Sequence, residues 1–187
     1  MNDDHTLAGN LGSLTGLARP ALTDVPSVVD RLTRISAVAA TLQPRGEDDG
    51  VACFSRLYQQ ITEDVLASYE NGSLFRCGDF IIELDIAFAQ RYLDAMLAHG
   101  TPGASVPGCW QLLFDRRQDD GVEPWRFAAT GVNAHVNFDL AFALLDVWER
   151  HPDDPLGTTD EQYDDYRAIN TIFERNMDSL CGKFDAP

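Results

Sequence analysis

Basic residues are scarce in this chain, and its charge is strongly one-sided. The 187 residues include 14 Lys and Arg against 30 Asp and Glu, which gives a formal net charge of −16. Such a surface repels phosphate backbones and anionic membrane surfaces, so we expect neither nucleic-acid binding nor membrane binding. The N-terminus, MNDDHTLAGN, lacks the basic start and the apolar core of a signal peptide, which favours a cytoplasmic location.

Sequence signatures of several common catalytic sites are also missing. The chain contains no glycine-rich phosphate loop, no Gly-x-Ser-x-Gly elbow and no His-Glu-x-x-His helix. Its cysteines show no Cys-x-x-Cys spacing, so we expect free thiols rather than disulfides or a zinc site at Cys53, Cys77, Cys109 and Cys181.

The sequence pattern indicates helices throughout. No pair of strands with a turn signal stands out, whereas apolar residues recur at steps of three and four. Asp24 before Pro26, and Thr158 three residues before Glu161, are typical of helix N-termini. We therefore expect an all-α fold, an irregular single-domain bundle of about six helices over residues 24–187, preceded by a flexible arm over residues 1–23.

The most apolar segment runs from Trp125 to Trp148. Its length would suit a membrane span, but hydrocarbon disfavours charged groups by several kcal/mol each. Because apolar residues surround it on all sides, we interpret it as a central helix covered by the others. The polar residues that argue against a membrane span are Asn133, His135, Asn137, Asp139 and Asp146.

Polar residues on apolar helix faces are informative, because a buried polar group destabilises the fold unless it is paired. Asp85 shares one helical line with Phe88 and other core residues, and His135 and Asp139 lie one turn apart. The polar positions selected in this way, or beside such a stripe, are Asp85, Arg91, Tyr92, Asn133, His135, Asn137, Asp139 and Asn170.

The favoured hypothesis is a small-molecule enzyme with a pocket at His135. His135 would act as the general acid or base, and Asp139 or Asp85 would orient its ring. Lyase, cyclase or isomerase chemistry suits this set because no nucleophile stands out. Nearby Met and aromatic residues indicate a largely apolar substrate. The residues expected to bind it are Arg91, Tyr92, Asn133, Asn137 and Asn170.

Two other hypotheses stay open. His135, Asp139 and Asp85 could hold a divalent metal and support metal-dependent hydrolysis. Alternatively, the same polar groups could only fix helix register in a non-catalytic binding or scaffold protein. An ion pair between Arg91 and Asp85 would be compatible with either a structural or a substrate-binding role. A cavity lined by Asp85, His135 and Asn170 would favour the catalytic hypotheses, and tight packing there would favour the scaffold.

Four segments resemble the bacterial domain-of-unknown-function family 5995. They are DDGVACFSRLYQQIT (48–62), ELDIAFAQRYLDAM (83–96), FAATGVNAHVNFDLAFAL (127–144) and DDYRAIN (164–170). The most specific part, GVNAHVNFDL, is similar to that family's Asn-Ala-His-x-Asn-x-Asp-Leu signature. The resemblance covers about residues 45–180 and implies a helical fold. It also implies that the eight polar residues named above fall on the polar positions of the family's motifs. It implies no reaction, although some members look like accessory enzymes of specialised-metabolite pathways.

Overall fold

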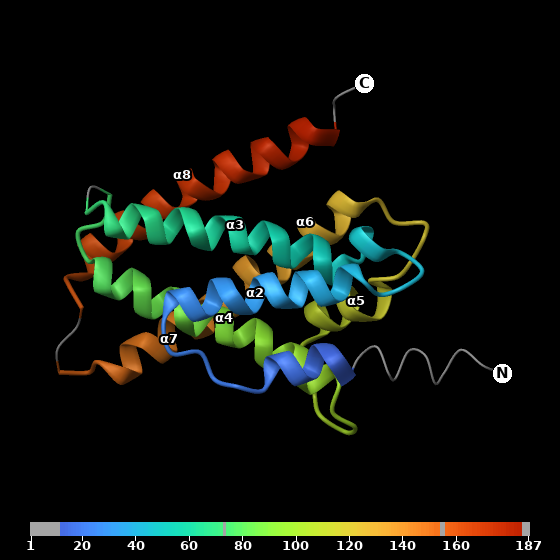
Figure 1. Ribbon diagram of the computed structural model, residues 1–187. Coiled ribbons are helices and arrows are strands. Elements are labelled where there is room, and N and C mark those ends of the chain that lie inside the picture. Colours follow the sequence, from blue (N-terminus) through green and yellow to red (C-terminus); the bar gives the residue numbers. More distant parts are fainter. Residues whose placement is uncertain (1–11, 73, 154–155, 185–187) are drawn as a thin grey trace.

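The computed structural model describes the backbone of residues 12–72, 74–153 and 156–184, and the side chains as far as residue 177. This part of the chain is helical and contains no β-strand, so the predicted all-α, single-domain class is confirmed. The main helices are α2 (Val25–Ala40), α3 (Gly50–Glu70), α4 (Gly78–His99), α5 (Gly108–Arg116), α6 (Pro124–Ala134), α7 (Leu140–Arg150) and α8 (Thr159–Phe184) (Figure 1). A 3₁₀ turn, η1 (Gly46–Asp48), lies between α2 and α3, and a π-helical segment, η2 (His135–Asp139), lies between α6 and α7.

The predicted helix N-termini are confirmed. Asp24 caps α2, because its Oδ1 accepts a hydrogen bond from the Ser27 backbone N–H at 2.7 Å. In turn, the Ser27 hydroxyl oxygen accepts a hydrogen bond from the Asp24 backbone N–H. Before α8, Thr158 and Glu161 form the expected reciprocal pair. These caps satisfy backbone N–H groups that lack a partner within the helix, so they fix where each helix begins.

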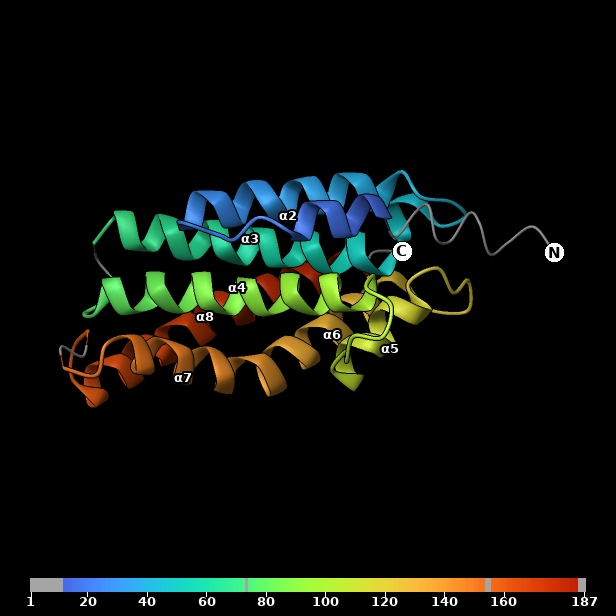
Figure 2. The same cartoon turned by 90° about the horizontal axis from the view of Figure 1, so that it is seen from below.

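The helices form a layered bundle in which α3 and α4 occupy the middle. Figure 2 shows α2 on one side and α6 and α7 on the other, with α3 and α4 between them. Two apolar clusters fill the interior. The larger one joins α2, α3, α4 and α5, and the smaller one joins parts of α3 and α4 to α7 and α8. Phe88 of α4 packs against both clusters.

The segment from Trp125 to Trp148 is not a central helix, and that part of the prediction is wrong. It forms α6, η2 and α7, and it lies at the side of the bundle opposite α2 (Figure 2). Its outer face is exposed and apolar. Uniform apolarity indicated burial on all sides, but only one face is covered by α3, α4 and α8. The exposed side chains are Trp125, Phe138, Phe142, Leu145 and Trp148.

The residues just before α2 pack against the domain. Residues 12–18 form a short helix, and Leu14 and Ala18 are buried in the larger cluster. Arg31 of α2 donates hydrogen bonds to two backbone carbonyls of this segment, at 2.6 and 2.9 Å. The flexible arm over residues 1–23 stays a prediction. The structure describes it only over residues 12–23, where Leu14, Ala18 and Leu22 are buried. Residues 1–11 lie outside the described part.

None of the described helices is long and apolar enough to cross a membrane. Among the cysteines that the structure describes, Cys53, Cys77 and Cys109 are free and half-buried. The side chain of Cys181 lies outside the described part.

Candidate functional site

A cavity of about 190 Å³ lies between α3, α4, α8 and the segment formed by α6 and η2. This volume exceeds the roughly 150 Å³ of an engineered protein cavity that binds benzene. The cavity lies where the two apolar clusters meet, so most of its wall is apolar. The wall also contains the polar side chains of Tyr58, Asp85, His135 and Asn170.

His135 is held in place by a buried hydrogen-bond chain. Its Nδ1 lies 3.0 Å from Asp139 Oδ2, and the same oxygen accepts a hydrogen bond from Trp110 Nε1 at 2.9 Å. Burial lowers the pKa of His135, although the hydrogen bond to Asp139 acts in the opposite direction. A neutral ring that donates from Nδ1 to Asp139 carries a free lone pair on Nε2, which is the form a general base requires.

The local backbone explains why His135 and Asp139 are both buried. The N–H of Leu140 donates to the carbonyl of His135, five residues earlier, so this turn is wider than an α-helical turn. His135 and Asp139 both lie in the interior, and Asn137 between them is exposed. Single π-helical turns of this kind are frequent at functional sites.

Three polar atoms at the cavity have no hydrogen-bond partner. Five buried side-chain polar atoms in the described part of the chain lack a partner, and three of them belong to the cavity wall: Tyr58 OH, Asp85 Oδ2 and His135 Nε2. They come from α3, α4 and η2. An unpaired buried polar atom typically costs about 1–3 kcal/mol. Three such atoms at one cavity therefore require hydrogen-bond partners that the described part of the chain does not supply.

Burial also changes the acid–base properties of two of these groups. Desolvation raises the pKa of Asp85 to about 7. The pKa of Tyr58 lies well above its ordinary value, first because of burial and then because of the negative charges of Asp85 and Asp139. Tyr58 is therefore a permanent O–H donor, whereas Asp85 exchanges its proton near neutral pH.

Aromatic rings enclose the imidazole. The ring of Phe88 stacks on His135 with the centroids 3.4 Å apart and the planes at 7°, and Tyr58 meets the imidazole edge-on at 4.5 Å. Gly131 of α6 lets this wall form, because a Cβ atom there would overlap the Phe54 ring of α3. The close approach of α6 to α3 thus positions the residues that follow in η2.

The structure brings together four of the eight residues selected from the sequence. Asp85, His135 and Asn170 line the cavity, and Asp139 supports His135 from behind. Asn170 is also exposed, so it stands at the edge of the cavity rather than in a buried helix contact. The cavity that was expected if the cluster is functional is therefore present.

The other four residues lie elsewhere. Asn133 and Asn137 are exposed and bond to each other at 2.8 Å, because they lie on the outer face of the helix. The hydroxyl of Tyr92 is buried, bonds to Ser55 at 3.0 Å and does not line the cavity.

Arg91 does not pair with Asp85, and that prediction is wrong. Its Nε donates to Asp146 of α7 at 3.0 Å, and its guanidinium lies over the Phe142 ring. Arg91 follows Asp85 by six residues, so the two side chains leave α4 on different faces. Asp146 lies beside Arg91 because α7 packs along α4.

The geometry does not favour a metal at this place. Asp139 Oδ2 already accepts two hydrogen bonds, and the Nδ1 of His135 is committed to it. Within the described residues, no group of three or more His, Cys, Asp and Glu side chains is placed to hold a metal ion.

Sequence reasoning missed two residues of the site. In the sequence pattern Tyr58 and Trp110 both belong to apolar helix faces, so neither stands out as a polar site residue. Trp110 lies 29 residues before Asp139, so no local pattern connects the indole N–H with that carboxylate. Tyr58 follows Phe54 at a step of four, and this spacing does not show whether its hydroxyl is paired.

The comparisons with known proteins give a family and no function. The model of the family of unknown function DUF5995 matches residues 25–186, a range that contains every residue of the cavity wall. No curated protein matches the chain, and no solved structure matches it. The chain belongs to the family of unknown function DUF5995.

Proposed function

We propose that this protein is an enzyme that performs acid–base chemistry on a small molecule in the cavity at His135. The observation that carries the proposal is the group of three unpartnered polar atoms on one apolar cavity wall, contributed by Tyr58, Asp85 and His135. A purely structural cluster would be expected to pair its polar atoms, because unpaired atoms destabilise the fold. A role in the biosynthesis of specialised metabolites, which the family resemblance implies, is part of the same proposal.

Each polar group has a distinct role in this proposal. His135 Nε2 takes a proton from the substrate, while Asp139 and Trp110 hold the ring in the productive tautomer. The Tyr58 hydroxyl donates to the atom on which negative charge develops. Asp85, whose pKa is about 7, is the second titratable group and contacts the substrate directly.

The composition of the wall limits the reaction type. Within the part of the chain whose side chains the structure describes, no Ser, Cys or Lys lines the cavity, so the usual nucleophiles of covalent catalysis do not occur on this wall. Proton transfer leading to elimination, isomerisation or cyclisation needs only a positioned acid and base. The volume of about 190 Å³ and the apolar wall fit a small, largely apolar substrate.

A chromogenic proton-transfer probe tests this function without knowledge of the natural substrate. A nitro-substituted benzisoxazole is small and aromatic. Removal of the proton on the carbon of its isoxazole ring forms a nitrile, breaks the N–O bond and gives a coloured cyanophenolate. We expect turnover by the protein, and a loss of about 10²-fold or more in kcat/KM in the His135→Gln variant. Folding of the variant is verified by its circular dichroism spectrum and its unfolding transition.

Two results would contradict the proposal. One is a rate no higher than that of free imidazole at the same concentration and pH. The other is full turnover by a folded His135→Gln variant. Replacement of the surface residue His151, which lies beside Glu83 outside the cavity wall, provides the matched control and should leave turnover unchanged.

A further inference from the structure

The charge and the ring content of the cavity wall restrict the chemistry of its ligand. Among the described residues, Asp85 is the only acidic side chain on the wall, and neither Lys nor Arg lines it. The Oδ2 atom of Asp85 is enclosed and has no hydrogen-bond partner in the structure. A ligand with a carboxylate or a phosphate would find no counter-charge there and would be repelled by Asp85.

Five aromatic side chains belong to the same wall. Their rings present negative π-faces, and a cage of such rings together with a carboxylate is the chemistry that recognises ammonium groups. Phe88 stacks on the neutral imidazole of His135, and Tyr58 lies against the same ring, so these aromatic groups are adjacent to the polar atoms. The five residues are Phe54, Tyr58, Phe88, Tyr166 and Phe173.

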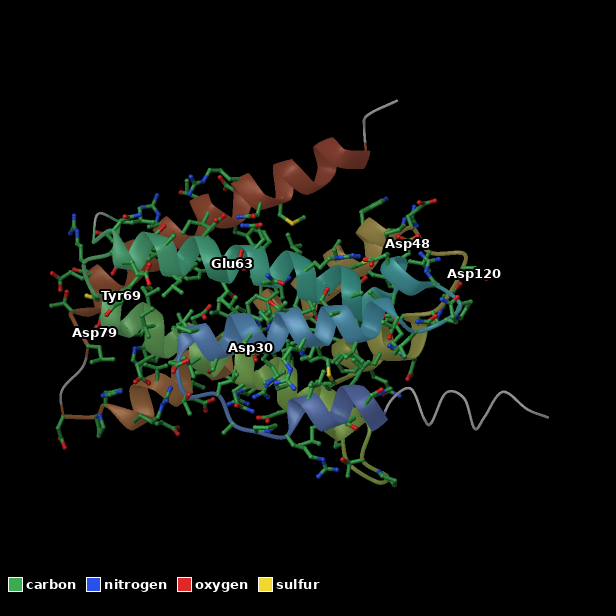
Figure 3. All side chains as sticks on the ribbon, in the orientation of Figure 1. Asp30, Asp48, Glu63, Tyr69, Asp79 and Asp120 are labelled. Atoms are coloured by element: carbon green, nitrogen blue, oxygen red, sulfur yellow. The ribbon has the colours of Figure 1, made fainter. Side chains whose placement is uncertain are left out.

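The outside of the molecule favours the same class of ligand. Figure 3 shows labelled acidic side chains at both ends of the bundle and along its middle, among them Asp30, Glu63 and Asp120. The net charge of −16 attracts cations toward the whole surface and raises their local concentration. Amines would therefore be enriched near the cavity, and organic anions would be depleted.

We propose that the substrate is a small organic cation, an amine or a quaternary ammonium compound, whose charged nitrogen is bound by Asp85 and the surrounding aromatic rings. The inference rests on the proposed function and adds the substrate class to it. The ammonium group supplies the counter-charge that Asp85 lacks, and the apolar part of the ligand lies against the aliphatic wall. His135 Nε2 and the Tyr58 hydroxyl are then left for the reacting atoms.

Binding should depend on the protonation of Asp85. Besides Asp85, the titratable groups among the described residues of the cavity wall are Tyr58 from α3, His135 from η2 and Tyr166 from α8, and Asp139 lies behind His135. Tyr58 stays protonated, and burial keeps His135 neutral, so neither brings a charge that competes with Asp85. Because burial raises the pKa of Asp85 to about 7, affinity for a cation should increase as the pH is raised through that value.

Calorimetric titration with choline, and with the neutral isostere in which carbon replaces its nitrogen, tests the charge preference. The two probes have nearly the same shape, and neither contains an amine proton that titrates. We expect choline to bind the wild-type protein at least about tenfold more tightly. This preference should disappear in the Asp85→Asn variant. It should persist in Asp30→Asn, which makes the same change in net charge on the surface of α2.

Equal affinity for the two probes, or no binding of choline at about 10 mM, would overturn the inference. Such a result with intact turnover of the benzisoxazole would remove the amine specificity and leave the proposed function in place. Selective choline binding in a protein that does not turn over the benzisoxazole would establish an ammonium site without catalysis. The comparison of the two probes uses wild-type protein, so it does not depend on the folding of any variant.

Discussion

Two aspartates with enclosed carboxyl oxygens, Asp49 and Asp85, differ in how completely their carboxyl groups are paired. Asp49 lies at the N-terminus of α3 and accepts hydrogen bonds from the backbone N–H groups of Val51 and Ala52, at 2.8 and 3.3 Å. It also accepts from Arg117 at 2.9 Å and from Gln118. Asp85 lies in the middle of α4, and its Oδ2 has no partner.

The difference separates a carboxyl group that the fold pairs completely from one whose Oδ2 atom has no partner in the described part of the chain. Burial raises the pKa of both carboxyl groups, but at Asp49 the Arg117 charge and the backbone N–H groups act against the increase. No such compensation exists at Asp85, where burial is the cause of the shift. The paired carboxylate connects α3 to the C-terminus of α5, whereas the unpaired one faces a cavity.

Removal of the partner of Asp49 should produce the largest effect. In an Arg117→Met variant the carboxylate would lose its counter-charge in the interior, and the free energy of unfolding should fall by about 3–5 kcal/mol. Urea unfolding followed by circular dichroism measures the change. Arg116→Met is the matched control, since Arg116 precedes Arg117, is exposed and pairs with half-buried Asp119. A loss no larger than that of the control would mean that the pair contributes little to stability.

The raised pKa of Asp85 should make the free energy of unfolding depend on pH. Its folded-state pKa is raised from 3.8 to about 7, so the folded protein binds this proton more tightly than the unfolded chain does. Relative to Asp85→Asn, the free energy of unfolding of the wild type should fall by about 2–4 kcal/mol between about pH 4 and pH 7, and then level off. All other titrating groups are common to both proteins.

Urea titrations at a series of pH values give this difference directly. An Asp146→Asn variant serves as a control, because that carboxylate is exposed and paired with Arg91. Parallel pH profiles for the wild type and Asp85→Asn would contradict the assignment of a raised pKa. They would also remove the contrast between the two aspartates.

The exposed amide pair should show the smallest effect. An Asn137→Ala variant loses only the 2.8 Å hydrogen bond to Asn133 on the surface, so stability should change by no more than about 0.5 kcal/mol. Turnover of the benzisoxazole should stay at the wild-type level. A tenfold loss of turnover would contradict this expectation and would support the substrate-binding role expected for Asn133 and Asn137 from the sequence.

Residues that interact one turn apart could be identified from the sequence. The caps at Asp24 and Thr158 follow local rules, and His135 with Asp139 forms the expected pair. The orientation of Asn133 and Asn137 toward a ligand could not be inferred, because the helix face that a neighbour covers depends on how α6 and α7 pack. The exposed aromatic residues of α7 show the same limit, since apolar composition does not specify which face is covered.

The sequence by itself determined the all-α class, the helix N-termini and the place of the polar cluster, because these depend on periodicity and on hydrogen bonds within a few residues. Only the tertiary structure decided which polar groups are paired. Asp49 meets Arg117 across 68 residues, and Asp139 meets Trp110 across 29, whereas Asp85 meets no partner among the described residues. Such pairing depends on the packing of distant helices, and so does the cavity that Asp85 lines.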